Sequence, residues 1–323
     1  MSFVKLFNEI NKGDAALAGG KGASLGEMTQ VGIPVPPGFV VLSSAFERFL
    51  KETRLHEDID AIIHGVNHQE MQTVEHASEQ IQALILAAAM PQDVAEEIKN
   101  SFQKLGAEYV AVRSSATAED SSSAAWAGQL DTFLNTKEEN LLANVQKCWA
   151  SLFTPRAIFY RFEQGLHEVH ISVAVAVQKM VESEYSGIAF SVHPVTEDRN
   201  QLIIEAGFGL GEAIVSGQVT PDSYVVEKEP RKIREVSVST QERGLYRVPA
   251  GGNEWIDIPE PKASSQVLTE AQILELSELI LKIEKHYGFP CDIEWAYACP
   301  EQDRGEGGKF YITQSRPITT LSQ

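Results

Sequence analysis

The sequence predicts an α+β protein of two lobes. Its 323 residues are about twice the length of a typical domain of roughly 150 residues. Helical patterns fill most of residues 44–106, and segments rich in Val, Ile and aromatic residues follow after residue 107. The mix of helices with largely antiparallel strands favours the α+β class. We place the boundary near residue 182, which gives lobes of residues 1–182 and 183–323.

The N-terminal part predicts short elements that are broken by Gly and Pro. Residues 19–28, GGKGASLGEM, predict a glycine-rich loop that runs into a helix. The prolines and the glycine of residues 34–38 end that helix, and residues 39–42 predict a strand. Farther along, Pro91 begins an amphipathic helix, and residues 139–153 predict another helix.

The rest of the chain predicts strands, one long helix and a final hairpin. Thr269 and Gln272 fit a capping box, and Gly288 ends the helix that they begin. A polar loop of residues 299–308 separates the last two strands. The predicted strands are residues 109–113, 171–181, 187–192, 202–205, 223–227, 291–298 and 309–316.

Composition excludes several classes of protein. The 27 Lys and Arg against 45 Asp and Glu give a formal net charge of −18. Such a surface repels phosphate backbones, so we expect no binding to nucleic acid or to an anionic membrane. The three cysteines form no CxxC pair, which argues against a disulfide framework and against structural zinc. The chain has no signal-like start and no apolar run of about 18 residues, so we expect a soluble, cytoplasmic protein.

Four polar residues on the last two strands form the most informative pattern. Side chains alternate between the faces of a strand, so Asp292 shares a face with Glu294, and Gln314 shares a face with Arg316. A hairpin could align the two pairs into one patch. Carboxylate oxygens suit Mg²⁺ and an arginine suits a phosphate, so this patch could hold a metal–triphosphate. The alternative is a solvated strand face with a surface ion pair.

A second pattern follows the strand predicted over residues 110–117. This strand ends in Arg113 and the small hydroxyl residues of Ser114–Thr117. Small residues let backbone N–H groups approach an anion, and hydroxyl groups add donors. The next loop, residues 125–132, contains Gly128, which permits a tight turn. The two segments could form a phosphate cradle, and the alternative is a serine-rich surface loop.

Other patterns carry less weight. The lysine at position 21 is not a Walker lysine, because the position six residues before it is Ala15. The glycine cluster of residues 207–212 lacks the G-x-G-x-x-G spacing of dinucleotide-binding folds. His64 and His68 are four residues apart and could bind a metal, but no third ligand is evident. No Ser–His–Asp or Cys–His arrangement stands out.

Taken together, the segments resemble one known family. The segments are GGKGASLGEM, GIPVPPGFVV, VAVRSSATAED, AGQLDTFLN, VQKMV, EAGFGLGEAIVSG, TPDSY, DIEWA and TQSRPIT, in this order. The set is similar to the N-terminal ATP-binding domain of the phosphoenolpyruvate synthase / pyruvate phosphate dikinase family, which includes rifamycin phosphotransferases. The resemblance covers about residues 3–320 and implies an ATP-grasp-like fold with ATP and Mg²⁺ held between two lobes.

The resemblance also implies roles for single residues. It implies three cationic residues at the phosphates, which are Lys21, Arg113 and Arg316. It implies a Mg²⁺ site formed by Asp292, Glu294 and Gln314. Residues 178–181 resemble the hinge that lines the adenine pocket. The remaining residues expected to bind the nucleotide are Ser114, Thr117, Gly128, Gln129, Thr132, Gln178, Lys179, Met180, Val181 and Glu205.

The implied activity is incomplete within this chain. Members of the family transfer phosphate from ATP to a histidine on a separate domain and then to a third substrate. No histidine here has the family's Thr-Ser/Cys-His-Ala context. We expect a phosphotransferase of the kinase type that converts ATP to AMP and phosphate with a phosphohistidine-bearing domain or subunit, and that works with a domain for pyruvate, phosphoenolpyruvate or another small molecule. The chain would be either a stand-alone subunit or an excised domain. The alternatives are a non-catalytic nucleotide-binding module and an ATP-grasp ligase that releases ADP.

Overall fold

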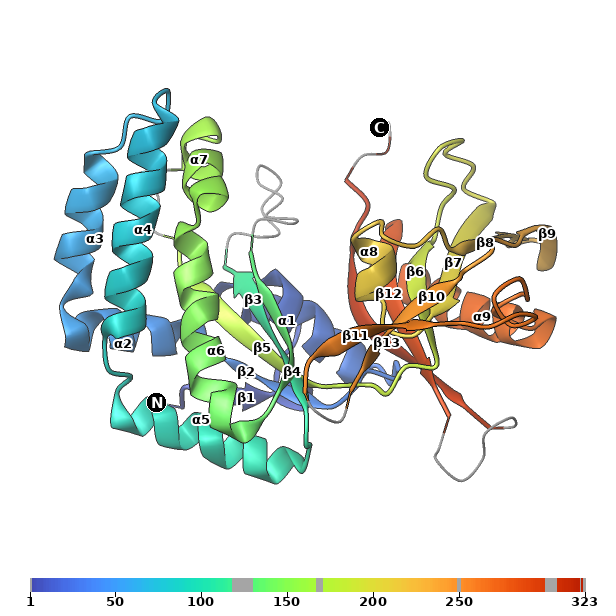
Figure 1. The fold of residues 1–323 in the computed structure, drawn as a ribbon, viewed down its shortest axis with the longest axis horizontal. Helices are drawn as coiled ribbons and strands as arrows, with labels where there is room; N and C mark the ends of the chain where they lie inside the picture. The colour runs from blue at the N-terminus through green and yellow to red at the C-terminus, as the bar shows by residue number, and fades with distance from the viewer. Residues whose placement is uncertain are drawn as a thin grey trace. The chain divides into compact units, whose positions relative to one another are not determined.

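The chain folds into two compact units of helices and antiparallel sheets (Figure 1). The structure, a computed structural model, describes residues 2–117, 130–166, 171–248, 251–299, 307–319 and 321. Unit 1 contains Met1–Gln30 and Pro37–Met180, and unit 2 contains Val31–Pro36 and Val181–Gln323. The α+β class is confirmed. The division falls two residues before the predicted boundary, and the prediction did not include the assignment of Val31–Pro36 to unit 2.

Unit 1 is built on a five-stranded sheet with the order β1-β2-β5-β3-β4. Every neighbouring pair in this sheet is antiparallel. The central β5 (Val173–Lys179) lies between β2 (Gly38–Val41) and β3 (Val110–Ala116). The edges are β1 (Val4–Leu6) and β4 (Thr132–Thr136).

The two faces of this sheet differ in their side chains. Successive residues of a strand point to opposite faces. The alternate valines of Val173–Val177 belong to the main hydrophobic core of unit 1. Ala174, Ala176 and Gln178 therefore point to the other face. This second face has small residues where the first has valines, which leaves room for long polar side chains from the neighbouring strand.

Within the described residues, α2, α5 and α6 contact the strands of this sheet, and α3, α4 and α7 lie side by side and extend the same core (Figure 1). The aromatic rings of Phe46 and Phe49 lie 5.6 and 5.0 Å from the ring of Trp149 and fill the centre of this layer. The helices are α2 (Ser43–Thr53), α3 (Leu55–His64), α4 (Met71–Ala87), α5 (Gln92–Leu105), α6 (Glu138–Ala150) and α7 (Pro155–Glu163). Short 3₁₀ turns are η1 (Phe7–Glu9), η2 (Lys12–Asp14) and η3 (Ser151–Phe153).

The remaining helix of unit 1, α1 (Ala15–Gln30), contacts β3 and β5 through small residues. Gly19 has a φ of +67° that interrupts the helical backbone, and a Cβ there would lie 2.1 Å from the Ser115 hydroxyl oxygen. A Cβ at Gly26 would lie 2.5 Å from the carbonyl oxygen of Ile10. The predicted glycine-rich loop is therefore largely helical, and these glycines permit close packing of the helix.

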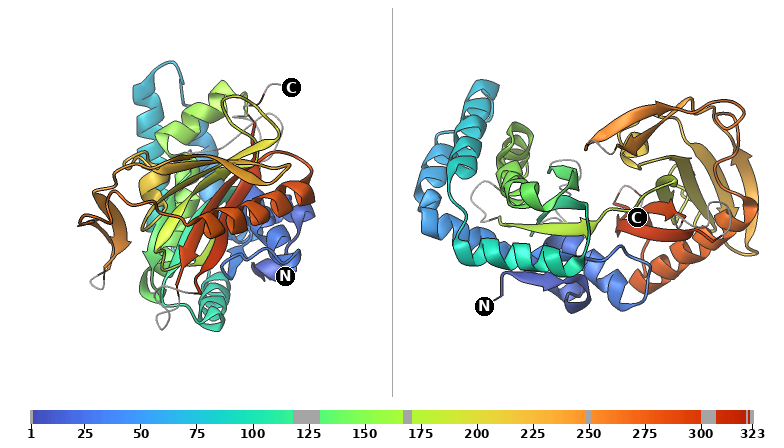
Figure 2. Two further views of the ribbon diagram at one scale, coloured as in Figure 1. Left: turned by 90° about the vertical axis from the view of Figure 1, so that its right-hand side faces the viewer. Right: turned by 60° about the horizontal axis from the view of Figure 1, so that its bottom comes forward.

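Unit 2 is built on a six-stranded sheet with the order β13-β12-β6-β7-β8-β9. One row across this sheet contains Ile293, Ile204 and Tyr224, which are fully buried. Helix α9 (Glu270–Tyr287) contacts β7, β9 and β12, and it can be followed across the strands in Figure 2. The strands are β6 (Tyr185–Phe190), β7 (Gln201–Phe208), β8 (Asp222–Glu227), β9 (Lys232–Ser237), β12 (Cys291–Ala298) and β13 (Lys309–Pro317).

The predicted caps of the long helix are confirmed. The Thr269 hydroxyl accepts a hydrogen bond from the Gln272 N–H, and the Gln272 side chain accepts one from the Thr269 N–H. Gly288 follows α9 with a φ of +77°, the left-handed conformation that favours glycine at this position.

A two-stranded ribbon and a short helix complete unit 2. The strands β10 (Arg243–Arg247) and β11 (Asn253–Asp257) pair with each other, and α8 (Glu212–Val215) follows the loop after β7. The Leu210 N–H of that loop donates to the Leu245 carbonyl at 2.8 Å, so the ribbon holds the loop. Residues 243–257 carried no predicted strand, because Arg and Gly interrupt the first segment and polar residues dominate the second.

A buried carboxylate joins three segments of unit 2. Asp222 is fully buried, and its Oδ2 accepts from the Tyr224 hydroxyl and the Val267 N–H, each at 2.8 Å. Its Oδ1 accepts from the Ser239 N–H at 3.0 Å. The Tyr224 hydroxyl in turn accepts from the Leu268 N–H. The TPDSY segment of the sequence therefore anchors the chain on both sides of the β10–β11 ribbon.

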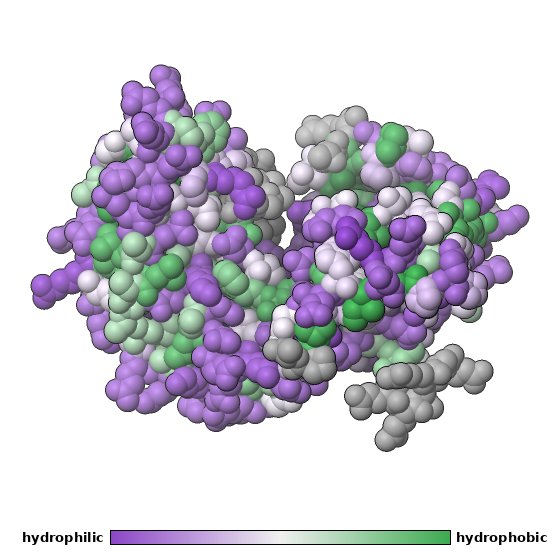
Figure 3. Space-filling model, viewed as in Figure 1, coloured by the Kyte–Doolittle hydropathy of each residue, from purple (hydrophilic) through white to green (hydrophobic). Residues whose placement is uncertain are grey.

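Two further properties concern the described part of the chain. No helix within it is long and apolar enough to cross a membrane. Cys148, Cys291 and Cys299 are all free thiols, as expected from their spacing. The face drawn in Figure 3 is largely hydrophilic with scattered apolar side chains, in keeping with the formal net charge of −18.

Changing Asp222 to Asn is expected to destabilise unit 2. The amide would direct a donor at groups that already donate, so buried N–H groups would lose their acceptor, at a cost of about 2–4 kcal/mol. Urea unfolding monitored by circular dichroism measures this cost. Glu278→Gln is the control, because Glu278 forms an exposed ion pair with Arg231. Equal midpoints for the two variants would contradict the anchoring role of Asp222.

Changing Gly19 to Ala is expected to lower stability more than the same change at Gly288. Gly288 has the left-handed αL conformation, with a φ of +77° and a ψ of +14°, where an alanine costs about 1–2 kcal/mol. Gly19, with a φ of +67° and a ψ of 168°, lies in a region that essentially only glycine adopts, so its backbone alone disfavours alanine by about 1–3 kcal/mol. The Gly19 Cβ would also meet the Ser115 hydroxyl and backbone, whereas a Cβ at Gly288 meets nothing within 4 Å. Thermal melts of the two variants measure the extra loss at Gly19, which combines the backbone strain with the clash. Similar losses in both would show that α1 does not need this close approach to β3.

Candidate functional site

The predicted alignment of polar pairs on the last two strands is present in unit 2. Strands β12 and β13 form an antiparallel pair in which Asp292 lies opposite Arg316, and Glu294 lies opposite Gln314. Because both pairs alternate with buried residues, the four side chains lie on one face of the sheet. The hairpin thus combines two carboxylates, an amide and a guanidinium.

A β-bulge makes this arrangement compatible with the core. Between the pairs Glu294–Gln314 and Trp295–Ile312, β13 contains one extra residue, Thr313. Without it, Gln314 and Ile312 would share a face, because they are two residues apart. With it, Ile312 is fully buried opposite Trp295 while Gln314 stays with the polar group. Strand alternation alone did not predict this bulge.

The Arg316 guanidinium is oriented by Asp292. Its Nε and Nη2 lie 2.8 and 2.6 Å from the same oxygen, Asp292 Oδ2. Burial raises the pKa of the Asp292 carboxyl above its ordinary value, Arg316 acts in the opposite direction, and nearby Glu294 adds to the rise. Arg316 is about half exposed and Asp292 is largely shielded, so the ion pair lies at the edge of the sheet with the guanidinium outermost.

Glu205 lies on the same face but one strand removed. Glu294 is opposite Ile188 of β6, and Ile188 is opposite Glu205 of β7. Strands in a sheet are about 4.8 Å apart, so the Glu205 backbone lies roughly 10 Å from that of Glu294. Burial raises the pKa of the Glu205 carboxyl. Glu205 therefore belongs to the polar face without being a direct neighbour of the hairpin group.

The donor set of the hairpin fits a magnesium ion that is shared with a phosphate ligand. Among the described residues, no group of three or more His, Cys, Asp and Glu is arranged to hold a metal by itself. Mg²⁺ commonly takes one or two carboxylates, water and substrate phosphates, and does not need a full protein cage. Asp292 and Glu294, with the Gln314 amide oxygen, supply donors of that kind.

The cationic residues predicted in the first half of the chain meet in unit 1. Lys21 is on α1, and its Nζ donates to the Ser114 carbonyl of β3 at 2.9 Å. Arg113 is on β3 and is only 9% exposed. Its Nη1 donates to the Gln178 Oε1 of β5 at 3.4 Å. The α1 helix and the sheet therefore bring an ammonium and a guanidinium to the same face.

The structure separates the two serines that follow Arg113. The Ser114 hydroxyl faces the main core, where it contacts the carbonyls of Asp131 and Cys148 and the Ser151 hydroxyl. Its carbonyl, and not its hydroxyl, contacts Lys21. The Ser114 hydroxyl therefore has partners within the core of unit 1, and its role in a phosphate cradle stays a prediction. Ser115 is two residues after Arg113 and shares its face, and the Ser115 Oγ accepts from the Gly22 N–H at 3.3 Å. Strand alternation could have identified Ser115.

The hydroxyl residues around β3 and β4 have different surroundings. Thr117 is partly buried, and its hydroxyl donates to the Ser172 carbonyl at 3.1 Å. Thr132 is exposed and lies opposite Arg113 across the β3–β4 pair. Gly128 and Gln129 lie outside the described residues.

The four residues expected at the hinge are not equivalent. Gln178 is 3% exposed and faces Arg113, whereas Lys179 is exposed. The Lys179 N–H donates to the Pro37 carbonyl, and the Met180 N–H donates to the Tyr109 carbonyl. These two hydrogen bonds lie at the end of β5 in the sheet of unit 1. Val181 is the first residue of the second segment of unit 2.

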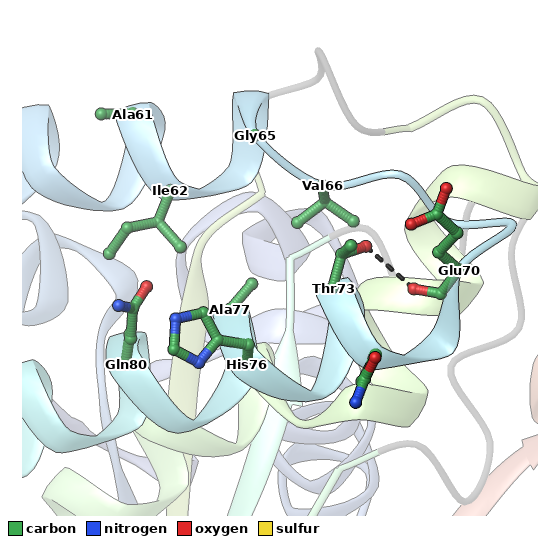
Figure 4. Close-up of a pocket in the computed structure, with 10 residues that line it drawn as sticks. Ala61, Ile62, Gly65, Val66, Glu70, Thr73, His76, Ala77 and Gln80 are labelled. Carbon is green, nitrogen blue, oxygen red and sulfur yellow. Dashed lines mark hydrogen bonds between the residues drawn. The ribbon is translucent and has the colours of Figure 1, made fainter.

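A groove in unit 1 contains none of the predicted site residues. It has a volume of about 570 Å³ and lies between α3 and α4. Figure 4 shows Ile62 and Val66 on one side, with Ala77, His76 and Gln80 of α4 on the other. Its lining has neither a cation for phosphate nor a cluster of metal ligands, so it does not support a nucleotide site.

Comparisons with known proteins identify the family of this chain. A family model described as "Pyruvate phosphate dikinase, AMP/ATP-binding domain" matches residues 15–323. The probable phosphoenolpyruvate synthase of Methanocaldococcus jannaschii is 44% identical over 330 residues, which cover 100% of this chain and 27% of that protein. The corresponding protein of Archaeoglobus fulgidus is 46% identical over 319 residues, which cover 97% of this chain and 41% of that protein. The rifampicin phosphotransferase of Bacillus cereus is 42% identical over 323 residues, which cover 99% of this chain and 36% of that protein.

The chain therefore spans less than half of the length of these curated relatives. The family match extends over both units, so it includes the cationic group of unit 1 and the hairpin of unit 2. It confirms the resemblance drawn from the motifs and the ATP-grasp-like fold that the resemblance implied. This chain belongs to the family of pyruvate phosphate dikinase AMP/ATP-binding domains.

Proposed function

We propose that this chain binds Mg-ATP and transfers its two terminal phosphates to a histidine on a separate domain or subunit, with AMP as the leaving group. Water then releases one of them as inorganic phosphate and the histidine keeps the other, so that ATP and water become AMP, inorganic phosphate and a phosphohistidine overall. The β12–β13 hairpin is the observation that carries the proposal. Its bulge keeps Trp295 and Ile312 in the core and leaves Asp292, Glu294, Gln314 and Arg316 on one face. A strand face that is merely solvated would not require a bulge to keep these four polar side chains together.

In this proposal the residues of unit 1 act on the phosphates. Lys21 and Arg113 offset negative charge on the transferring group, and Thr132 contacts the triphosphate. Lysine supplies a compact point charge, whereas the planar guanidinium of arginine can bind two phosphate oxygens at once. The partly buried surroundings strengthen both interactions, because fewer water molecules screen them.

The residues of unit 2 act on the metal and on the last phosphate. Asp292, Glu294 and Gln314 would hold Mg²⁺, which, when bound, neutralises charge on the phosphate oxygens. The Arg316 guanidinium is oriented by the Asp292 carboxylate and would bind the terminal phosphate directly. We assign Gln178–Val181 to the adenine pocket and Glu205 to the nucleotide, as the family resemblance implies.

The chain requires a partner in this proposal. The relatives with which it aligns are more than twice as long as the aligned part, and their names describe a phosphoenolpyruvate synthase and a rifampicin phosphotransferase. A histidine-bearing domain or subunit would accept the phosphate and pass it to pyruvate or another small molecule.

The nucleotide product is expected to identify the reaction. The chain alone with Mg-ATP should release little nucleotide product, and addition of desalted extract from the source cells should yield AMP and phosphate. Anion-exchange chromatography of the nucleotides measures both, and extract without the chain is the control. ADP formed by the chain alone would overturn the phosphohistidine mechanism and favour a ligase or a kinase that transfers directly.

Changing Glu294 to Gln is expected to raise the Mg²⁺ concentration needed for half-maximal ATP binding by roughly tenfold, equivalent to about 1.4 kcal/mol. The amide keeps the size of the side chain but removes a negative oxygen ligand. Isothermal titration of ATP at several Mg²⁺ concentrations measures this. Glu235→Gln is the matched control, because Glu235 lies on the exposed edge strand of the same sheet. An unchanged Mg²⁺ requirement would refute the metal assignment.

A further inference from the structure

One side chain of helix α9 joins the ends of two strands of the unit 2 sheet. The Glu284 carboxylate accepts two hydrogen bonds from the Lys228 ammonium, at 2.9 Å on Oε1 and 2.7 Å on Oε2. Glu284 Oε1 also accepts from the Ser191 hydroxyl at 3.1 Å. Ser191 directly follows β6, and Lys228 directly follows β8. We call these three residues, Ser191, Lys228 and Glu284, the α9 network.

The α9 network continues into the backbone at the start of β12. The Ser191 N–H donates to the Cys291 carbonyl at 2.9 Å, as expected for opposite residues of an antiparallel pair. In the return direction, the Cys291 N–H donates to the Ser191 side chain, with 2.8 Å between the nitrogen and Oγ. Both residues are fully buried. The first hydrogen bonds between β12 and β6 therefore depend on the orientation of the Ser191 hydroxyl, which Glu284 fixes.

This contact holds the residue next to Asp292. Pro290 precedes Cys291 and has no N–H, so the Cys291 N–H is the first that β12 can donate. Asp292 points to the opposite face of the sheet, where its carboxylate orients the Arg316 guanidinium. A movement of the Cys291 backbone would therefore move the Asp292 carboxylate and the guanidinium with it.

Packing of α9 does not explain the α9 network. The Glu284 and Lys228 side chains are 22% and 12% exposed. An ion pair this shielded loses hydration that offsets much of its attraction, so it adds little stability. It does fix the direction of the carboxylate, because Lys228 binds both oxygens. The helix is anchored without it by fully buried apolar side chains, which are Ile273, Leu276, Ile280 and Ile283.

We propose that Glu284 and Ser191 are positioning residues for Asp292. They fix the start of β12 from the α9 side of the sheet and so hold the proposed Mg²⁺ ligand on the other side. This assignment rests on the proposed function and deepens it. Glu284 and Ser191 act through the backbone of the strand and contact neither the metal nor the phosphates.

Two substitutions of Glu284 separate positioning from charge. Oε1 accepts from both Ser191 and Lys228, so Glu284→Gln can keep both bonds through its amide oxygen and loses the charge. Glu284→Met keeps a similar length and loses the bonds as well. Isothermal titration of ATP into the full chain at several Mg²⁺ concentrations measures the effect on the metal requirement.

Glu284→Met should raise the Mg²⁺ concentration needed for half-maximal ATP binding by roughly threefold. This is less than the roughly 10–100-fold typical of groups that bond directly to a metal ligand, because the effect passes through the backbone. ATP binding at saturating Mg²⁺ should stay within about twofold, and Glu284→Gln should change the Mg²⁺ requirement by less than about 1.5-fold.

Hydrogen exchange of the ligand-free chain tests the same contact without ATP. Mass spectrometry of a peptide that contains Cys291–Glu294 should show faster exchange in Glu284→Met and in Ser191→Ala, and unchanged exchange in Glu284→Gln. Ser191→Ala removes the acceptor of the Cys291 N–H and should raise the Mg²⁺ requirement as Glu284→Met does. It is the smaller change, so it keeps the test available if Glu284→Met does not fold. The double variant should show little more than either single effect, because the two residues act as a unit.

Two control variants account for a loss of stability alone. Glu278→Met removes an exposed ion pair with Arg231 on the same helix. Tyr224→Phe removes a buried hydroxyl that donates to Asp222 in the same sheet. Tyr224→Phe should lower the thermal midpoint of unfolding, and neither control should change the Mg²⁺ requirement.

Other results would overturn the inference. Equal rises in the Mg²⁺ requirement for Glu284→Gln and Glu284→Met would assign the effect to charge. A similar rise for Tyr224→Phe would assign it to stability. An unchanged requirement in both Glu284→Met and Ser191→Ala would leave the α9 network a structural contact only, and unchanged exchange in both would show that it does not hold β12. If the unchanged chain shows no Mg²⁺-dependent ATP binding, the proposed function fails whatever the exchange result, and this inference fails with it.

Discussion

Each unit must present charged side chains on one face of a sheet while the other face remains a hydrophobic core. Unit 2 meets this constraint with one extra residue, Thr313, which lets Ile312 and Gln314 occupy opposite faces. Unit 1 meets it with small residues and glycines, so that Arg113 lies over Ala176 and helix α1 can approach β3 closely. In both units the backbone, through the bulge in unit 2 and the small residues in unit 1, determines where the charged side chains lie.

The two arginines of these groups are held in different ways. Arg316 is about half exposed and pairs with the Asp292 carboxylate, where water screens much of the interaction. Arg113 is almost fully buried and contacts the neutral amide of Gln178. A carboxylate beside a buried arginine would satisfy it strongly and would also cancel its charge.

The sequence was sufficient wherever a local rule determines the structure. Strand alternation predicted that Asp292 and Glu294 share a face, and the capping box at Thr269 located the start of the last helix. The sequence was insufficient where the structure depends on strand pairing or on packing between elements. The bulge at Thr313 depends on the partner strand. The glycines of α1 suggested a loop, because close helix–sheet contact has no signature in a single sequence.

Charge indicates what the proposed phosphate site at the hairpin would require. The group has two carboxylates, Asp292 and Glu294, and one guanidinium, Arg316, so with both acids ionised its net charge is negative. Burial raises the pKa of Asp292 and disfavours its charged form, while Arg316 favours that form. Such a group would repel a triphosphate on its own. With a divalent cation bound to the carboxylates, the same group would attract a phosphate, and Arg316 would orient that phosphate through hydrogen bonds. The acids are therefore consistent with a phosphate site only as metal ligands, which is why the Mg²⁺ dependence of ATP binding depends on Glu294 in this account.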